Sequence, residues 1–169
     1  DVIVQRILPT GSSASSATID ASGAGIADYA QAMTLDAACN IYIAGNTNTR
    51  FFVMKLNVGL SVLWTSYYVT GATPRAITVD TSGFVYVTGD DNIDLYTLVY
   101  RASNGTPLDT LIFTDNANNR VESIDVREGD NSIHLGFRSR DSHYKAAAVK
   151  YVKGAGNQWS RAWVSYYGD

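Results

Sequence analysis

The stretch AMTLDAACNIYIAG, residues 32–45, recurs along the chain as AITVDTSGFVYVTG, residues 76–89. A looser third copy begins with SIDVR at residues 123–127 and continues with IHLG at residues 133–136. Each copy alternates apolar and polar residues on both sides of a short turn, which is the pattern of two half-buried strands in a hairpin. The repeat therefore predicts that the chain consists of copies of one β-structured unit.

The third copy can be aligned with the second in two ways. Matching the glycines Gly89 and Gly136 would place the polar Ser132 at a core position. The apolar alternation instead matches Val85 with Ile133, which makes the third turn one residue longer. Because a slip of one residue turns every side chain to the opposite face of the sheet, we expect the alternation to define the register.

A second hairpin follows the first in every unit. Its leading strand is predicted from FFVMKL at residues 51–56, LVYR at residues 98–101 and AVKY at residues 148–151, with a further copy, VIVQRI, at residues 2–7. The chain is therefore one half unit followed by three whole units. Each whole unit holds four strand-sized segments.

A repeat of roughly 40–50 residues with four strands is typical of β-propeller blades. We expect an all-β fold of four-stranded antiparallel blades, about three and a half in number, either open or part of a larger propeller. The 169 residues form one repeat domain, with a half blade at 1–22 and blades at about 25–69, 70–115 and 116–166. The alanine-rich segment 145–150 has helical propensity, but its place in the repeat predicts a strand.

The composition argues against several functional classes. A hydrophobic content of 46% makes disorder unlikely, and 13 basic against 16 acidic residues give a formal charge of −3, unlike the basic surface of a nucleic-acid binder. No run approaches the ~18 apolar residues that a membrane span needs. The single cysteine excludes an internal disulfide framework.

The units resemble the SBBP β-propeller repeats of secreted and surface proteins. The resemblance rests on Asp36, on NIYIAG at residues 40–45, on FFVMKL at residues 51–56, and on Gly59 followed by Trp64. The second unit departs from the pattern with Tyr100 in place of the lysine, and the third with Arg127 in place of the aspartate. The resemblance implies a propeller fold and an extracellular or cell-surface location. It implies no reaction, because a fold does not determine a function.

The blade number leads to the main functional hypothesis. Propellers typically have four to eight blades, and the N-terminal half unit supplies only the outer two strands of one. An open strand edge pairs readily with another strand, and a head-to-tail contact that does not close builds a filament. We therefore predict a non-catalytic extracellular scaffold or self-assembling fibre subunit, whose partners are copies of itself or the rest of a longer chain. Tyr166 and Tyr167, at the C-terminal edge, are the predicted assembly contact.

Two other functional classes stay open. A carbohydrate-binding propeller would carry at least two exposed aromatic side chains beside Asp or Asn on the loops of one face, and glycans would be its partners. A propeller lyase or glycosidase would gather His, Arg or carboxylates near the blade axis. The chain has only His134 and His143, and in the triplet Asp-Ser-His at residues 141–143 neighbouring side chains of an extended chain point to opposite faces. We find no catalytic motif and predict no enzymatic activity.

Three further positions are candidate sites. Asp90, Asn92 and Asp94 place oxygen ligands at alternate positions, as at the start of a calcium loop, although the glycine of such a loop is missing. A plain polar loop is the expected role of these residues, with Ca²⁺ binding as the alternative, and no other cofactor is predicted. Asn104 begins the glycosylation sequence Asn-Gly-Thr, which is also a good hairpin turn. Cys39 is expected to be a small, partly buried turn residue, with an intermolecular disulfide as the alternative.

Overall fold

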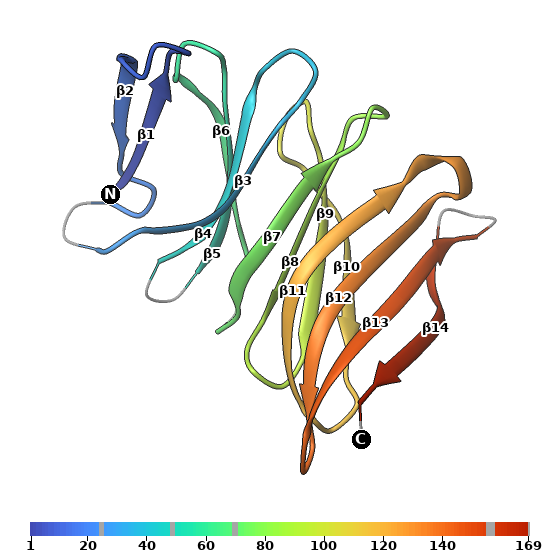
Figure 1. Cartoon of the computed structure of the whole chain (residues 1–169). Coiled ribbons are helices and arrows are strands. Elements are labelled where there is room, and N and C mark those ends of the chain that lie inside the picture. The colour runs from blue at the N-terminus through green and yellow to red at the C-terminus, as the bar shows by residue number, and fades with distance from the viewer. Residues whose placement is uncertain (24–25, 48–49, 69–70, 155–157, 169) are drawn as a thin grey trace.

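The structure, a computed structural model, describes residues 1–23, 26–47, 50–68, 71–154 and 158–168, and these form four antiparallel sheets (Figure 1). The first sheet has two strands, β1 (Val2–Ile7) and β2 (Ser13–Ile19). The other three have four strands each, which confirms the all-β fold of four-stranded blades. The expected blade boundaries at residues 25 and 69–70 lie outside the described residues.

In each four-stranded sheet, the strands lie in sequence order. The first blade contains β3 (Tyr29–Leu35), β4 (Ile41–Asn46), β5 (Phe51–Leu56) and β6 (Val62–Tyr68). The second contains β7 (Thr73–Val79), β8 (Phe84–Asp90), β9 (Leu95–Arg101) and β10 (Pro107–Phe113). The third contains β11 (Asn118–Arg127), β12 (Ser132–Arg140), β13 (Tyr144–Lys153) and β14 (Trp159–Tyr167). The alanine-rich segment lies in β13, as the repeat predicts.

The sheets pack face to face as propeller-like blades. Strands β3 and β4 pack against β7, and β7 and β8 pack against β11, so the inner strands of successive blades are neighbours (Figure 1). The one helical element in the described ranges is the three-residue turn η1 (Glu128–Asp130). No helix in those ranges is therefore long and apolar enough to cross a membrane.

An apolar cluster fills each space between sheets. Val2 and Val4 of the two-stranded sheet pack with Phe52 and Met54 of the first blade. The next two spaces are filled by clusters that include Tyr42, Val85 and Tyr100, and Phe113, Ile133 and Phe137. Burial of these side chains, at about 25 cal/mol per Å² of apolar surface, is the main force that holds the blades together. The alternation in the sequence thus identified the faces that meet.

The repeated aspartate closes the turn after the inner strand. Tyr42 donates its hydroxyl to Asp36 Oδ2 at 3.0 Å, and Tyr86 donates to Asp80 Oδ2 at 2.9 Å. Burial, together with this hydrogen bond to a carboxylate, raises the pKa of both tyrosines well above the ordinary value. The Asp and Tyr of the repeat are therefore a structural pair that joins one turn to the following strand.

The register of the third blade follows the apolar alternation. Val85 pairs with Val79 in the second blade, and Ile133 pairs with Val126 in the third. Between the paired residues, the third turn is one residue longer, so the register predicted from the alternation is confirmed. Gly136 is not the counterpart of Gly89.

Candidate binding cleft and open half-blade

Each inner strand contains a β-bulge, and the side chain of the bulged residue pairs with the second strand of its own blade. The pairs are Gln31 Nε2 to Asn46 Oδ1 at 3.1 Å, Arg75 Nε to Asp90 Oδ2 at 3.1 Å, and Arg138 Nε to Glu122 Oε1 at 2.7 Å. A bulge redirects a side chain, so one position of the repeat carries a polar pair in all three blades. The pair is neutral in the first blade. In the second blade the first strand carries the arginine and the second strand the carboxylate, and in the third blade these positions are exchanged.

The burial of these pairs differs between blades, and the pair of the first blade stays exposed although the second blade follows it. The carboxylate of Asp90 is fully buried, because the third blade covers it and the backbone N–H of Val121 donates to it at 3.2 Å. Glu122 and Arg138, in the last blade, each remain about 49% exposed. The same repeat position is therefore a buried ion pair in one blade and part of an accessible surface in the next.

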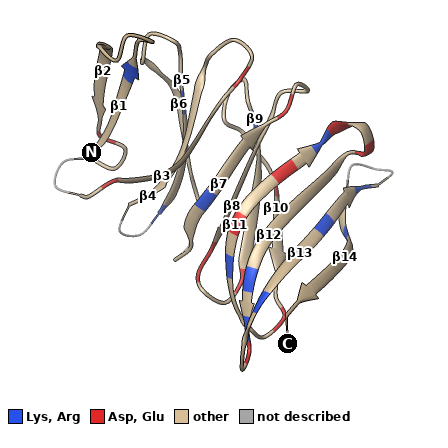
Figure 2. Ribbon diagram, viewed as in Figure 1, with Lys and Arg blue, Asp and Glu red and all other residues tan. Residues whose placement is uncertain are grey.

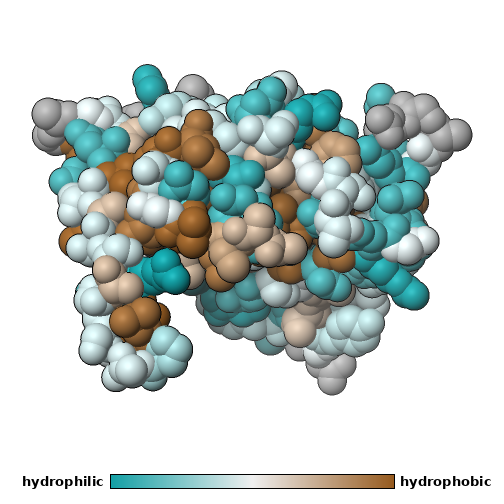
Figure 3. All heavy atoms as spheres, turned by 90° about the horizontal axis from the view of Figure 1, so that it is seen from above, coloured by the Kyte–Doolittle hydropathy of each residue, from teal (hydrophilic) through white to brown (hydrophobic). Residues whose placement is uncertain are grey.

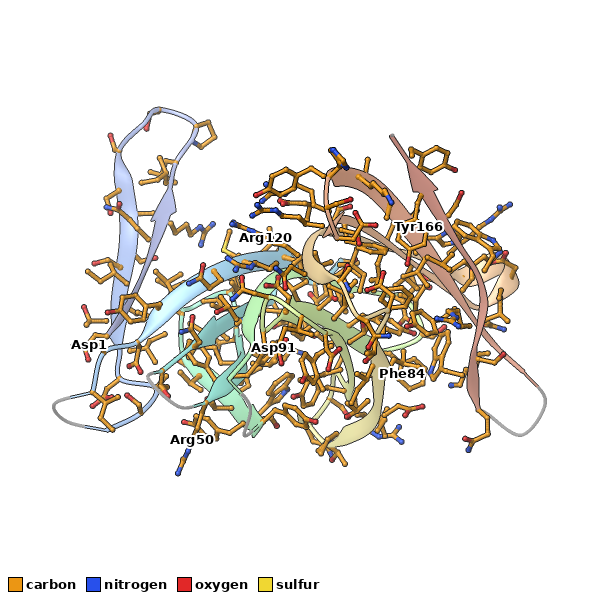
Figure 4. All side chains as sticks on the ribbon, turned by 90° about the horizontal axis from the view of Figure 1, so that it is seen from below. Asp1, Arg50, Phe84, Asp91, Arg120 and Tyr166 are labelled. Atoms are coloured by element: carbon orange, nitrogen blue, oxygen red, sulfur yellow. The ribbon has the colours of Figure 1, made fainter. Side chains whose placement is uncertain are left out.

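A cleft of about 420 Å³ lies between the second and third blades, at the ends of the strands where these bulges occur. The second blade contributes Asp91, Asn92 and Ile93, from the β8–β9 connection. The third blade contributes Asn118, Asn119, Arg120, Arg138, Arg140 and Tyr144. Figure 2 shows the basic residues at the lower ends of β11, β12 and β13. Figure 4, which looks at this end, places Asp91 and Arg120 in its central part.

The cleft combines three guanidinium groups with one carboxylate. Arg138 is paired with Glu122, while Arg140 donates to the hydroxyl of Tyr144 at 3.3 Å and lies over its ring. Partial burial opposes ionisation of Asp91, but hydrogen bonds from the backbone N–H groups of Asp94 and Ile93 and from the hydroxyl of Tyr96 lower its pKa. Asp91 is therefore ionised at neutral pH, and the cleft keeps an excess of positive charge.

Asn119 is the most enclosed side chain of the cleft. It is fully buried, and its Nδ2 donates to the carbonyl of Ile93 at 2.9 Å and to Asp115 Oδ1 at 2.6 Å. Its Oδ1 has no hydrogen-bond partner among the described residues. A buried acceptor without a partner costs about 1–3 kcal/mol, so this atom would gain from a donor placed in the cleft.

A second concave surface lies between β1 and β3. It has two adjoining parts of about 280 and 320 Å³, lined mainly by apolar residues that include Ile3, Val4, Met33 and Leu35. In the described chain, β1 has one hydrogen-bonded neighbour, β2, and its other edge is free. Figure 3 shows apolar side chains gathered on the body of the molecule beside the protruding hairpin. We call this surface the half-blade groove.

The calcium-loop residues have other roles in the structure. Asp90 ends β8 and is enclosed with Arg75, so it is not available as an accessible ligand. Asn92 adopts a left-handed turn conformation with φ 72°. Asp94 accepts a hydrogen bond from Thr114 at 2.7 Å. The alternate spacing reflects a strand end followed by a turn.

The glycosylation and cysteine positions both lie in turns. Asn104 is exposed, and its Oδ1 accepts hydrogen bonds from the backbone and the hydroxyl of Thr106, as in a side-chain-stabilised turn. Cys39 is exposed and free, so the expected partial burial is wrong. Its φ of 61° matches the left-handed φ of 87° at Gly83, its counterpart in the second blade. The residue lines the half-blade groove.

The two tyrosines expected at the assembly contact differ from one another. Tyr166 donates its hydroxyl to Asp115, in the connection between the second and third blades, and packs edge-on against Phe137. Tyr167 is 62% exposed on the outermost strand. Tyr166 therefore has a structural role within the chain, and an assembly contact at Tyr167 stays a prediction.

Neither histidine forms a catalytic triad. Ser132 donates its only hydroxyl proton to Asp130 Oδ1 at 2.5 Å, so His134 Nε2, 2.9 Å from the same oxygen, must donate to Ser132. Activation of a serine requires the reverse, with histidine accepting the proton. Ser142, which lies between Asp141 and His143, is part of an exposed turn. The hydrogen-bonded series of Asp130, Ser132 and His134 instead stands where the other blades have their Asp–Tyr pair.

Asp130 provides a pH-dependent test of this third-blade arrangement. Its hydrogen bond from Lys150, and then that from Ser132, lower its pKa to about 2. The contribution to stability is therefore present above the ordinary carboxyl pKa of 3.8 and is lost as the pH falls toward 2. In Lys150→Met we expect the carboxyl titration of Asp130, followed by ¹³C NMR, to shift upward toward 3.8. Lys55→Met, at the same repeat position in the first blade, should leave it unchanged.

Three carboxylates also meet near the start of the chain. Those of Asp1, Asp20 and Asp28 lie within 4.8 Å of one another. The α-ammonium of Asp1 stands 3.8 Å from Asp28, and Asp20 accepts hydrogen bonds from the backbone of Ser22 and Gly23. Backbone N–H groups of the chain already donate to Asp20 and Asp28, as they do in ordinary turns.

Comparison with known proteins supports the fold alone. No family model and no curated protein matches the sequence. A protein of unknown function from Bacteroides caccae is similar in structure, with a TM-score of 0.57 and 12% identity over 95% of this chain and 53% of that one. A protein from Lactobacillus plantarum gives a TM-score of 0.66 and 13% identity over 96% of this chain and 50% of that one. The chain spans about half the length of both.

Proposed function

We propose that the protein is a non-catalytic interaction module of the propeller type, acting outside the cell or at its surface, that binds a β-hairpin in its half-blade groove. The observation that carries the proposal is a contrast between two residues at the same repeat position. Met33 is 62% exposed, whereas Ile77, its counterpart in the second blade, is 8% exposed. Both are apolar residues of an inner strand, so the difference comes from what lies beside them.

The strands that cover Ile77 show which structural element is missing beside Met33. Strands β3 and β4, the inner hairpin of the first blade, pack against β7. The corresponding cover for β3 would be the inner hairpin of the preceding blade, of which β1 and β2 are the outer half. A strand paired to the free edge of β1 would satisfy its backbone groups, and a second strand beyond it would cover Met33.

The occupant is therefore a pair of antiparallel strands with the apolar alternation of β7 and β8. Its apolar face would lie on Met33 and Leu35, both exposed in the present chain. The proposal is supported by the similar structures, which are about twice as long and so have chain enough for further blades. It is also supported by the resemblance of the units to SBBP repeats, which occur in secreted and surface proteins.

The proposal is tested by completing the half-blade. Residues 73–94, which include β7, β8 and their connection to β9, are copied and fused directly before Val2, so that Val2 takes the place of Leu95. We expect the β1 amides to become strongly protected from hydrogen exchange. We also expect Tm to rise by several degrees, since about 1 kcal/mol corresponds to about 2–4 °C at this size.

The matched control separates specific pairing from the effect of added chain. In the control fusion, the copies of Phe84 and Tyr86, which face the following blade in the parent hairpin, are replaced by serine, which removes the apolar contacts toward β3 and keeps the length. This fusion should leave Tm and the exchange of β1 unchanged. Equal behaviour of the two fusions, or no protection of β1 in either, would show that the groove does not accept an inner hairpin.

A second function is favoured by the cleft between the second and third blades. Tyr144, an exposed aromatic residue, lies there beside Asp91 and Asn92, which is part of the arrangement expected of a carbohydrate-binding propeller. Neither His134 nor His143 lines the cleft. We propose saccharide binding as this second function, exerted at a surface separate from the half-blade groove.

A further inference from the structure

The arginines of the cleft have unused donor capacity. In the described chain, the Nη atoms of Arg120 and Arg138 have no hydrogen-bond partner, and Arg120 Nε lies 3.8 Å from Glu122, beyond hydrogen-bond distance. A guanidinium group presents its donors as a rigid fork that matches a carboxylate or a phosphate. Together with Arg140, these groups make the third-blade wall of the cleft a surface for an anion.

The opposite wall restricts the anion to a low charge and requires hydroxyl groups. Asp91 is ionised, so a dianion such as phosphate would be repelled from the side that faces the second blade. Asn119 Oδ1 is a buried acceptor without a partner among the described residues, and neither a carboxylate nor the dianion of a phosphate monoester can donate to it. A ligand with one anionic group and hydroxyl donors therefore fits both walls of the cleft.

Tyr144 adds a third feature. Its ring is 64% exposed at the start of β13, and the guanidinium of Arg140 lies 4.9 Å from the ring centre. Contact with Arg140 limits the motion of the ring, and its exposed surface can pack against the apolar face of a sugar. Aromatic rings that combine an apolar body with a polar tip are well suited to such contacts.

From these features we infer that the cleft binds an acidic saccharide, with a uronate carboxylate on Arg120 and Arg138, hydroxyls on Asn119 and Asp91, and a sugar ring against Tyr144. The inference rests on the proposed saccharide-binding function and names its ligand class. It is independent of the half-blade groove, which lies at the other end of the chain. A cleft of about 420 Å³ is in the size range of small-ligand sites, about 300–1,000 Å³.

The test measures binding of oligogalacturonate to the full chain by isothermal titration calorimetry, with the methyl-esterified oligosaccharide as the neutral counterpart. We expect the acid to bind at least about tenfold more tightly than the ester, because a charged hydrogen bond is lost in the ester. Its binding should also weaken as salt is raised. Arg120→Gln and Tyr144→Ala should each weaken binding of the acid by about tenfold.

Controls exclude a general effect of charge or of misfolding. Arg101→Gln removes an exposed arginine outside the cleft and should bind like the parent, and all variants should keep the parent far-UV circular dichroism. Equal binding of acid and ester with both weak would overturn both the ligand class and the saccharide-binding function. Equal, tight binding of both would keep saccharide binding and overturn the uronate assignment. Tighter binding of inorganic phosphate than of the oligosaccharide would identify a small-anion site and overturn the inference.

Discussion

Gly89→Ala is expected to destabilise the fold by about 3 kcal/mol, the upper end of the range for overpacking a filled site. A Cβ atom at this position would lie 2.4 Å from the carbonyl oxygen of Thr73 and 2.8 Å from Pro74 Cα. These are backbone atoms of the adjacent inner strand, next to its bulge, so they cannot rotate away. Denaturation by guanidinium chloride, followed by circular dichroism, measures the change.

The control for this prediction is Gly136→Ala. Here the obstacle is the hydroxyl oxygen of Ser123 at 2.7 Å, which belongs to a side chain and can move to another rotamer. We expect a cost of less than about 1 kcal/mol, since a single rotamer change is inexpensive. Similar losses in the two variants would contradict the view that the close backbone approach at the bulge requires glycine. Gly45 faces the same obstacle in the first blade, with Tyr29 O at 2.4 Å.

Arg75→Met is expected to cost about 3–5 kcal/mol, because it leaves the buried carboxylate of Asp90 without its cation. The double variant Arg75→Gln, Asp90→Asn introduces the neutral pair that the first blade already uses, Gln31 with Asn46. An asparagine oxygen at position 90 can still accept the backbone N–H of Val121. We therefore expect the double variant to recover most of the lost stability in the same denaturation assay.

The third blade supplies a matched comparison for this ion pair. Arg138→Met removes the cation from Glu122, which is half exposed, so we expect a loss below about 1 kcal/mol. If Arg138→Met were as damaging as Arg75→Met, burial of the carboxylate would not control the energetic importance of the pair. If the double variant were no more stable than Arg75→Met, the charge balance of the pair would not be the cause of the loss.

The predictable parts of the fold are those encoded locally. Alternation around Val85 and Ile133 identified the strands and their register, since a shift of one residue would have exposed every core side chain. The repeated Asp and Tyr of the turns were visible as a pattern, although their direct hydrogen bond was not. Positive φ at Cys39 could have been inferred from its alignment with Gly83, but its exposure could not.

The candidate cleft could not be predicted in the same way. Asp91 and Arg138 are far apart along the chain and meet only because the second and third blades pack face to face. Asp90 shows the limit most clearly. In sequence it is an acidic residue at calcium-loop spacing, whereas in the structure a bulged arginine and the next blade enclose it.

The sequence by itself determined the repeat, the four strands of each blade and the half unit at the start, because side-chain alternation and turn residues act over short distances. The tertiary structure alone decided which copies of a repeated position are buried and which are accessible. Met33 and Ile77 have the same local pattern and opposite exposure. The physical reason is that an inner strand is covered by the inner hairpin of its neighbouring blade, and at β3 the described chain has no such hairpin.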